Sequence, residues 1–269
     1  MNNQPQFSII TICFNSSATI ERTIKSVLAQ TFTDYEYIIV DGGSKDSTLD
    51  IVKKYEPLFK GRMKWKSESD KGIYDAMNKG IMRSSGEIIG IVNSDDWLEA
   101  DALEIVSECY KKNDPTIKSV CCGWMNFHYD NGSVQVLRTD ESMLYSMAKV
   151  YEMGGVRHPA TFVPKKLYEK YGIFDRNIKI MADTDLILRF VENQVNFIFP
   201  NKVLTNMSDG GTSNKGLMKA CNDFSNILKK RNIRGVKYFL LYYKWCAKRF
   251  IKGLLPVSVI KNIRDIKKS

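Results

Sequence analysis

The chain has only two histidines, and its six cysteines include no CxxC pair. A zinc site would have to be assembled from scattered ligands, which argues against zinc-finger and thiol-redox proteins. Because disulfides are rare inside cells, the unpaired spacing of the cysteines favours reduced thiols in an intracellular protein.

Long apolar runs are absent as well. No segment reaches the ~18 uncharged apolar residues of a membrane-spanning helix, and the N-terminus shows neither the basic region nor the cleavage pattern of a signal peptide. Internal repeats and low-complexity tracts are missing. These absences predict a cytoplasmic globular protein. Its 269 residues, 43% of them hydrophobic, suffice for one large α/β domain with an appendage.

Positive charge is concentrated at the C-terminus. The chain carries a net charge of +10, but residues 215–269 hold 15 Lys/Arg and two Asp/Glu, a balance of +13. Residues 1–214 hold 25 basic and 28 acidic residues, a balance of −3. This distribution argues against a nucleic-acid-binding core. It predicts a local patch in the tail that faces an anionic partner, either lipid head groups or nucleic acid.

Strand and helix patterns alternate through residues 1–114. Buried strands are expected at 7–14, 35–43, 63–68 and 87–97, and a helix is expected after each of them. This alternation indicates parallel strands joined by right-handed crossovers. Residues 1–114 therefore read as a nucleotide-binding α/β half.

The pattern changes over residues 115–214. A hairpin is predicted over 119–139 with Asp130-Asn131-Gly132 at its turn, followed by helices within 164–194 and one or two strands within 195–207. SDGGTSN, at 208–214, is read as a polar loop that either closes over a ligand or is an ordinary surface loop.

Aspartates follow three of the predicted parallel strands: Asp41, Asp70, and the adjacent pair Asp95 and Asp96. Ligands of open parallel sheets bind at the carboxyl ends of the strands. Carboxylates at that edge suit a divalent cation, or hydrogen bonds from ribose hydroxyls and base N–H groups. Helix capping explains Asp41 equally well. The adjacent pair is harder to explain by capping, because two neighbouring carboxylates repel unless a cation lies between them.

Two familiar nucleotide motifs are missing. The first strand is not followed by GxGxxG, and no GxxxxGK[ST] occurs. The sequence therefore lacks the main evidence for a dinucleotide-dependent dehydrogenase or a P-loop kinase.

Five segments, in this order and spacing, resemble the family 2 glycosyltransferases of the GT-A fold: FSIITICFNS, IIVDGGSKDST, SESDKGIYDAMNKGI, IVNSDDWL and MADTDLILRF. The resemblance covers about residues 5–215, and the third segment is similar to bacterial members that build O-antigen, capsule or exopolysaccharide. It implies a central, mostly parallel mixed sheet flanked by helices. It also implies a domain over 1–214 with an acceptor-binding half at 115–214, and a separate basic helical tail at 215–269.

The resemblance also implies a set of donor-binding residues. Thr11, Phe14 and Asp41 match positions that line the nucleotide base, with the Phe14 ring where an aromatic side chain stacks on uracil. Asp70 and Lys71 match positions near the base, ribose and diphosphate.

The NSDD stretch matches the metal site of the family. Asp96 is expected to bind Mn²⁺ or Mg²⁺, and Asp95 to contact the ribose or bridge to the metal. Asn93 stands where many members carry a further aspartate. A bound cation would stabilise the negative charge that develops on the leaving diphosphate.

The candidate general base is Asp183, which matches the second acid of a Glu-Asp pair in the family. Ala182 takes the place of the glutamate. From the residues alone, a helix N-terminal acid is the preferred interpretation of Asp183. Asp185 is expected to pair with Arg189 one helical turn later. His158 is expected to contact the substrate, although a histidine beside a proline is most often only packed or solvated.

These assignments predict an inverting, metal-dependent hexosyltransferase that moves a sugar from a UDP-sugar to a polyprenyl-diphosphate-linked glycan. The alternative is a metal-dependent sugar nucleotidyltransferase, but ITICFNSSATIERT lacks the Gly- and Arg-rich loop that such an enzyme needs after its first strand. A polymerising synthase would carry membrane spans and a QxxRW motif. A non-catalytic membrane-binding module would leave the ordered acids unexplained.

The tail helix around GVKYFLLYYKWCAKRFIKG carries Lys237, Lys244, Lys248 and Lys252 in one stripe beside aromatic residues. This pattern suits the surface of the cytoplasmic membrane, where a lipid-linked acceptor would be found. A core-packing helix whose lysines face water fits equally well. With a lipid partner for the tail, no nucleic acid is expected to bind.

Overall fold

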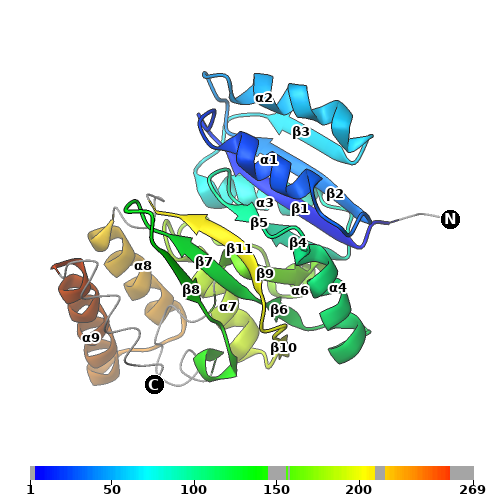
Figure 1. Cartoon of the computed structure of the whole chain (residues 1–269). Helices are drawn as coiled ribbons and strands as arrows, with labels where there is room; N and C mark the ends of the chain where they lie inside the picture. Colours follow the sequence, from blue (N-terminus) through cyan, green and yellow to red (C-terminus); the bar gives the residue numbers. More distant parts are fainter. Residues whose placement is uncertain (1–3, 145–155, 157, 210–215, 255–269) are drawn as a thin grey trace.

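The computed structural model describes residues 4–144, 156, 158–209 and 216–254. Its strands are β1 (Phe7–Cys13), β2 (Tyr35–Asp41), β3 (Met63–Ser67), β4 (Ile88–Ile91), β5 (Trp97–Leu98), β6 (Val120–Cys122), β7 (Trp124–His128), β8 (Val134–Leu137), β9 (Thr161–Pro164), β10 (Phe197–Ile198) and β11 (Val203–Ser208). They form a seven-stranded sheet in the order β10-β6-β9-β4-β1-β2-β3 and a four-stranded sheet in the order β5-β11-β7-β8 (Figure 1).

Helices cover both faces of the larger sheet. The α-helices are α1 (Ile20–Leu28), α2 (Thr48–Tyr55), α3 (Ile73–Arg83), α4 (Ala102–Asn113), α6 (Lys165–Tyr171), α7 (Ala182–Glu192), α8 (Leu217–Lys230) and α9 (Gly235–Leu254). Two 3₁₀ turns, η1 (Glu56–Phe59) and η2 (His158–Ala160), complete the described elements.

The strands β4, β1, β2 and β3 are neighbours and run parallel, so their carboxyl ends lie at one edge of the sheet. Strand β9 runs antiparallel to both of its neighbours, β4 and β6, whereas β10 pairs parallel with β6. The predicted mostly parallel mixed sheet is confirmed. The edge that carries the carboxyl ends points toward the side of the molecule where α8 and α9 lie (Figure 1).

The core follows from the alternation of side chains along the buried strands. Ile10 and Val40 point into a hydrophobic cluster that includes residues of α3, α6, α7 and α8. Ile9 and Ile39 point to the opposite face, into a cluster with α1, α2 and α4. Strands buried on both faces need apolar residues at every position, which explains the continuous apolar runs of the sequence.

The second sheet contains the predicted hairpin. Strands β7 and β8 pair antiparallel, and the turn between them places Gly132 at a φ of +80°. The stretch 119–130 divides between two sheets, because Gly123 separates β6 from β7. A side chain at this position would collide with Leu204 of β11. Likewise, residues 195–207 form two strands, β10 in the larger sheet and β11 in the smaller.

Helix α8 packs into the core of the main domain through Ala220, Phe224, Ile227 and Leu228. Helix α9 packs on α8, where the rings of Phe224 and Trp245 lie 4.7 Å apart. The tail that begins at residue 215 therefore starts with a helix that shares the hydrophobic core of the sheet. The division into a domain over 1–214, with its two halves, and a tail over 215–269 stays a prediction.

Candidate active site

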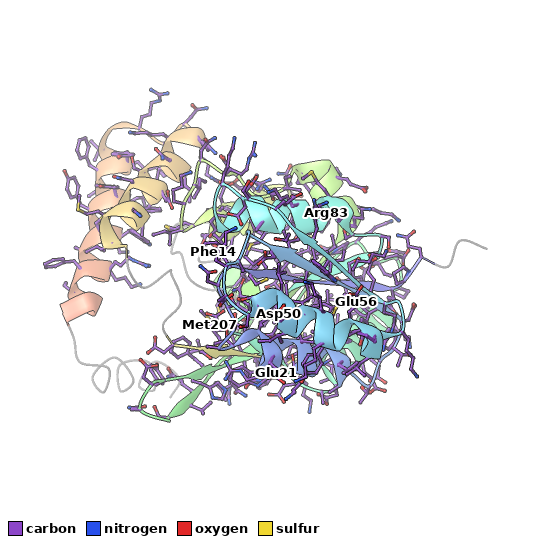
Figure 2. The ribbon with its side chains drawn as sticks, turned by 90° about the horizontal axis from the view of Figure 1, so that it is seen from above. Phe14, Glu21, Asp50, Glu56, Arg83 and Met207 are labelled. Atoms are coloured by element: carbon purple, nitrogen blue, oxygen red, sulfur yellow. The ribbon has the colours of Figure 1, made fainter. Side chains whose placement is uncertain are left out.

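The loops that follow β1, β2 and β4 are joined by hydrogen bonds. Asn15, at a φ of +49°, donates its N–H to Ser44 Oγ at 2.8 Å, and its Oδ1 accepts the N–H of Lys45 at 2.8 Å. The hydroxyls of Ser16 and Ser94 lie 2.9 Å apart. These contacts hold three strand ends in one continuous surface. Figure 2 shows Phe14 and Met207 at the end of the domain toward α8 and α9, with Glu56 and Arg83 at the opposite end.

Phe14, Gly42 and Asp70 come together at this edge. The Phe14 side chain is 61% exposed, although it is large and apolar. A Cβ atom on Gly42 would lie 2.4 Å from Asp70 Oδ2 and 3.3 Å from Phe14 Cδ2, so a side chain there would displace the Asp70 carboxylate. Asp70 is half-buried and accepts the N–H of Gly72 at 2.9 Å. An exposed ring can stack on a flat base. The carboxylate beside it can accept hydrogen bonds from a polar ligand.

Lys71 lies next to this group. Its side chain is exposed, and its backbone N–H donates to Asp75 Oδ2 at 3.0 Å. The turn that presents the ammonium group is therefore fixed to the start of α3. A cation on a fixed turn suits an anionic ligand such as a diphosphate.

Thr11 and Asp41, two of the expected base-lining residues, are buried away from this surface. Thr11 is fully buried within β1 and accepts the hydroxyl of Tyr37 at 3.0 Å. Asp41 is fully buried and accepts the N–H groups of Gly43 and Ser44 and the hydroxyl of Ser67. Burial opposes its charge, but the hydrogen bonds from the two serines keep the pKa of Asp41 below its usual value.

Both assignments stay predictions. Asp41 orders the loop after β2, which is the local capping role that the sequence left open, and Thr11 sits two residues short of the strand end. Cys13 is the β1 residue that reaches the edge, with its Sγ 3.6 Å from Asp41 Oδ1. Its thiol belongs to no recognisable motif, so sequence patterns do not point to it.

The Asn93–Asp96 stretch forms a turn closed by a hydrogen bond from Asp96 N–H to the Asn93 carbonyl at 3.1 Å. Asp96 is only 1% exposed, and its Oδ2 accepts the side-chain amide of Asn93 at 3.2 Å. Burial, and then the charge of Asp95, raises the pKa of Asp96 to about 8. Asp95 is half-buried, and the described residues give its carboxylate no hydrogen-bond partner.

The expected role of Asp96 as the metal ligand stays a prediction; the more accessible carboxylate of the pair in the structure is Asp95. The turn also holds two buried oxygen atoms without a donor, Asn93 Oδ1 and Asp96 Oδ1. Oxygen acceptors that lack donors fit a nearby hard cation. Within the described residues no three His, Cys, Asp or Glu side chains form a metal site by themselves. A cation held here would therefore need oxygen ligands in addition to these carboxylates.

Arg22 of α1 is a site residue that the sequence did not reveal. Its guanidinium donates to the Asp95 carbonyl at 2.7 Å and to Ser208 Oγ at 2.8 Å, and it lies 3.7 Å from the centre of the Trp97 ring. Arg22 thereby ties the acidic turn to the end of β11. The loop predicted at 208–214 continues from there, but residues 210–214 lie outside the described part of the chain.

Asp183 is the second residue of α7 and is half-buried. Its Oδ1 accepts the Thr184 N–H at 2.7 Å and lies 3.5 Å from the hydroxyl of Tyr74. Tyr74 belongs to the first turn of α3, four residues after Asp70, so α3 connects the donor-side edge with Asp183. The expected pair of Asp185 and Arg189 is confirmed, with Nε 3.1 Å from the Asp185 carboxylate.

His158 lies beside the same group. Its ring meets the ring of Phe174 edge-on at 5.5 Å, and Phe174 in turn stacks on Tyr74. Burial lowers the pKa of His158, while the charge of Asp183 acts in the opposite direction. The imidazole is therefore neutral at physiological pH and can accept or donate one hydrogen bond at each nitrogen.

A family model described as "Glycosyl transferase family 2" matches residues 8–170. An uncharacterised glycosyltransferase of Mycobacterium tuberculosis is 34% identical over 194 residues, which cover 70% of each chain.

Solved structures show the same architecture. Staphylococcus aureus TarS 1–349, solved in complex with UDP-GlcNAc, aligns with a TM-score of 0.68 and 19% identity. The alignment covers 83% of this chain and 66% of that one, and the chain spans 39% of a longer TarS structure. The mannosyltransferase PcManGT from Pyrobaculum calidifontis, in complex with GDP-Man and Mn²⁺, aligns with a TM-score of 0.62 and 14% identity, covering 98% and 80%.

Proposed function

The chain belongs to glycosyl transferase family 2 and is a glycosyltransferase of the GT-A fold, and we propose that it moves a sugar from a UDP-sugar to a hydroxyl group of a lipid-linked glycan with inversion. The observation that carries the proposal is the joined edge of β1–β4, where Phe14, Asp70 and Asp95 face one surface and α3 leads to Asp183. The family assignment removes the nucleotidyltransferase alternative.

The donor is proposed to bind along this edge. The exposed ring of Phe14 stacks on the base, and Asp70, against Gly42, accepts hydrogen bonds from the base or ribose. The ammonium group of Lys71 contacts the diphosphate. Because uracil is a small flat ring with one N–H, an aromatic face beside a carboxylate suits it, and UDP is the proposed nucleotide.

Asp95 is proposed to hold a divalent cation, Mn²⁺ or Mg²⁺, together with oxygen atoms of the diphosphate. Such cations bind through one or two carboxylates plus substrate phosphates, which fits a turn with one accessible carboxylate. When bound, the cation stabilises the charge of the departing diphosphate. Structures of related fold were solved with Mn²⁺ and a nucleotide or nucleotide sugar, which supports the choice of cation.

Asp183 is proposed to accept the proton of the attacking hydroxyl. A general base across the sugar from the leaving group permits direct displacement, which inverts the anomeric centre. The carboxylate is held by the Thr184 N–H and reaches the surface beside Tyr74. Neutral His158 is proposed to contact the substrate on this acceptor side. A role in bacterial surface polysaccharide synthesis, in which a polyprenyl-diphosphate carries the glycan, belongs to the same proposal.

A panel of nucleotide sugars tests the function. UDP-glucose, UDP-galactose, UDP-GlcNAc and UDP-GalNAc are compared with GDP-mannose and CTP, each with Mn²⁺ and with EDTA. We expect one UDP-sugar to release UDP slowly with water as the acceptor, and only with the metal. Turnover of GDP-mannose alone would overturn the choice of UDP. Absence of turnover and of thermal stabilisation by every sugar nucleotide would contradict the proposed donor site.

Helix α9 is proposed to place the enzyme on the inner face of the cytoplasmic membrane. Among the described residues, no helix is long and apolar enough to span a membrane. One face of α9 packs against the core through Tyr238, Leu241, Tyr242 and Trp245. Its opposite face exposes six large apolar side chains: Val236, Phe239, Leu240, Tyr243, Phe250 and Ile251.

The charge of α9 fits an anionic lipid surface. Lys237, Lys244 and Lys248 are exposed, and the helical repeat of 3.6 residues places them along one border of the exposed apolar face. The side chain of Lys252 lies outside the described residues. Residues 235–254 contain no acidic side chain. An apolar face bordered by lysines binds anionic bilayers by burying its apolar area and by electrostatic attraction.

Vesicle sedimentation tests this surface. The full chain is expected to pellet with phosphatidylcholine vesicles that contain one third phosphatidylglycerol, and less with pure phosphatidylcholine or at high salt. The double variant Phe239→Asp/Leu240→Asp is expected to remain in the supernatant. Leu58→Asp is the control, because Leu58 is 53% exposed on η1, far along the chain from α9. Equal pelleting of the double variant and the native chain would contradict the proposal.

A further inference from the structure

Helix α7 lacks a side-chain cap of its own. Its N-cap residue is Met181, whose side chain makes no capping hydrogen bond. The first backbone N–H groups of a helix need acceptors from elsewhere when they are shielded from water. Residues 179–181 lead into α7, and a side chain of a different helix accepts their backbone N–H groups.

That acceptor is Asp223 of α8, which is 3% exposed. Its Oδ2 accepts three consecutive backbone N–H groups: Ile180 at 2.6 Å, Lys179 at 3.0 Å and Met181 at 3.3 Å. Its Oδ1 lies 3.1 Å from the Lys179 nitrogen as well. A carboxylate bound by several N–H groups at a helix N-terminus is a strong, charge-assisted contact.

The same turn is held from its other side by Tyr74. The hydroxyl of Tyr74 donates to the carbonyl of Ile180 at 2.6 Å. Asp183 follows the turn by two residues. The position of its carboxylate therefore depends on a backbone that is hydrogen-bonded to both α8 and α3. Misplacement of a reacting group by ~1 Å costs about 10²-fold in rate.

We infer that Asp223 is a positioning residue, which binds the turn that leads into α7 from α8 and thereby sets the place of Asp183 in the active site. This inference rests on the proposed role of Asp183 as the base. It makes α8 part of the catalytic unit, although the sequence pattern assigns that helix to the tail. It also places a buried carboxylate beside the N-terminus of α7, where Ala182 stands in the place of the glutamate of the family motif.

The test compares Asp223→Asn with Asp185→Asn. Asp185 is also 3% exposed, but its carboxylate pairs with Arg189 at 3.1 Å and Arg231 at 2.9 Å and does not contact the 179–181 N–H groups. Both variants lose a buried carboxylate, so both are expected to lower Tm. Only Asp223→Asn is expected to lower kcat of UDP release, by about 10- to 100-fold, with the KM for the UDP-sugar unchanged.

Amide exchange of residues 179–184, followed by mass spectrometry, gives a readout that does not depend on activity. Exchange of this segment is expected to quicken in Asp223→Asn and to stay near the native rate in Asp185→Asn. Tyr74→Phe, which removes the other contact to the turn, is expected to lower kcat by about 3- to 10-fold, the effect of one hydrogen bond. Asp223→Glu, which keeps the carboxylate but displaces it by one methylene, is the second variant if Asp223→Asn does not fold.

Unchanged exchange of this segment in Asp223→Asn, or equal losses of kcat in Asp223→Asn and Asp185→Asn, would overturn the inference. If Asp223→Asn does not fold, native exchange of residues 179–184 together with native kcat in Asp223→Glu would overturn it. A native enzyme that turns over no sugar nucleotide would instead overturn the proposed function, while the exchange measurement would still decide whether Asp223 orders the turn.

Discussion

Replacing Asp183 with asparagine is expected to lower turnover of the UDP-sugar by about 10³-fold while donor binding is retained. The amide has the size of the carboxylate, and its oxygen can still accept the Thr184 N–H that now lies 2.7 Å from Oδ1. It cannot take a proton from an attacking hydroxyl. The donor residues Phe14 and Asp70 lie on other loops, so the substitution leaves the nucleotide site intact.

Two measurements separate these effects. UDP release reports kcat, and titration calorimetry with UDP and Mn²⁺ reports donor affinity. Asp185→Asn is the matched control, because Asp185 is on the same helix but is bound by Arg189 and Arg231. Turnover by Asp183→Asn within a few-fold of the native enzyme would remove Asp183 as the base. A parallel loss of UDP affinity would assign it a structural role instead.

The sequence was informative wherever local pattern and chain order determine structure. Apolar runs that end in polar residues located β1, β2 and β4, and alternation with helices predicted the parallel pairing that brings their ends to one edge. Phe14 follows β1 directly, and Asp70 lies three residues after β3. Their common position beside Gly42 is a consequence of sheet order, and sheet order can be derived from crossover connections.

Side-chain direction and burial were harder to predict. Thr11 and Cys13 lie on the same strand, and only the strand end decides which of them reaches the edge. The sequence around Asp41 and Asp96 does not show whether their carboxylates are accessible. In the structure both are buried and accept local hydrogen bonds. A motif shows that an acid is present, whereas its accessibility depends on how the surrounding turn folds.

Contacts between residues far apart in the sequence are not visible in the local sequence pattern. Arg22 meets the Asp95 carbonyl across 73 positions, and Asp223 meets Ile180 across 43. Both residues lie on amphipathic helices, where a charged side chain ordinarily faces water. Nothing in the helical pattern around Asp223 distinguishes a buried hydrogen-bond acceptor from a solvated acid. The sequence pattern therefore places α8 in the basic tail and does not predict that it packs into the core.

The acidic turn yields the second large expected effect, a difference between Asp95→Asn and Asp96→Asn. Asp95 is the accessible carboxylate, so its loss is expected to remove activation by Mn²⁺ and to lower turnover by at least about 10²-fold, the effect of several kcal/mol of charge stabilisation. Asp96 is 1% exposed and bonded to the Asn93 amide. An asparagine there can keep that hydrogen bond and is expected to cost about tenfold or less.

The measurement is UDP release across a Mn²⁺ titration for both variants and the native chain, with Tm as the check on folding. Identical amide substitutions at adjacent positions each remove one carboxyl group, so the comparison shows which of the two the metal needs. If Asp96→Asn abolished metal activation while Asp95→Asn kept it, the buried carboxylate would be the ligand, and the turn would have to open when the donor binds. The predicted order instead requires only the turn as it stands, with the Asp95 carboxylate accessible and Asp96 buried.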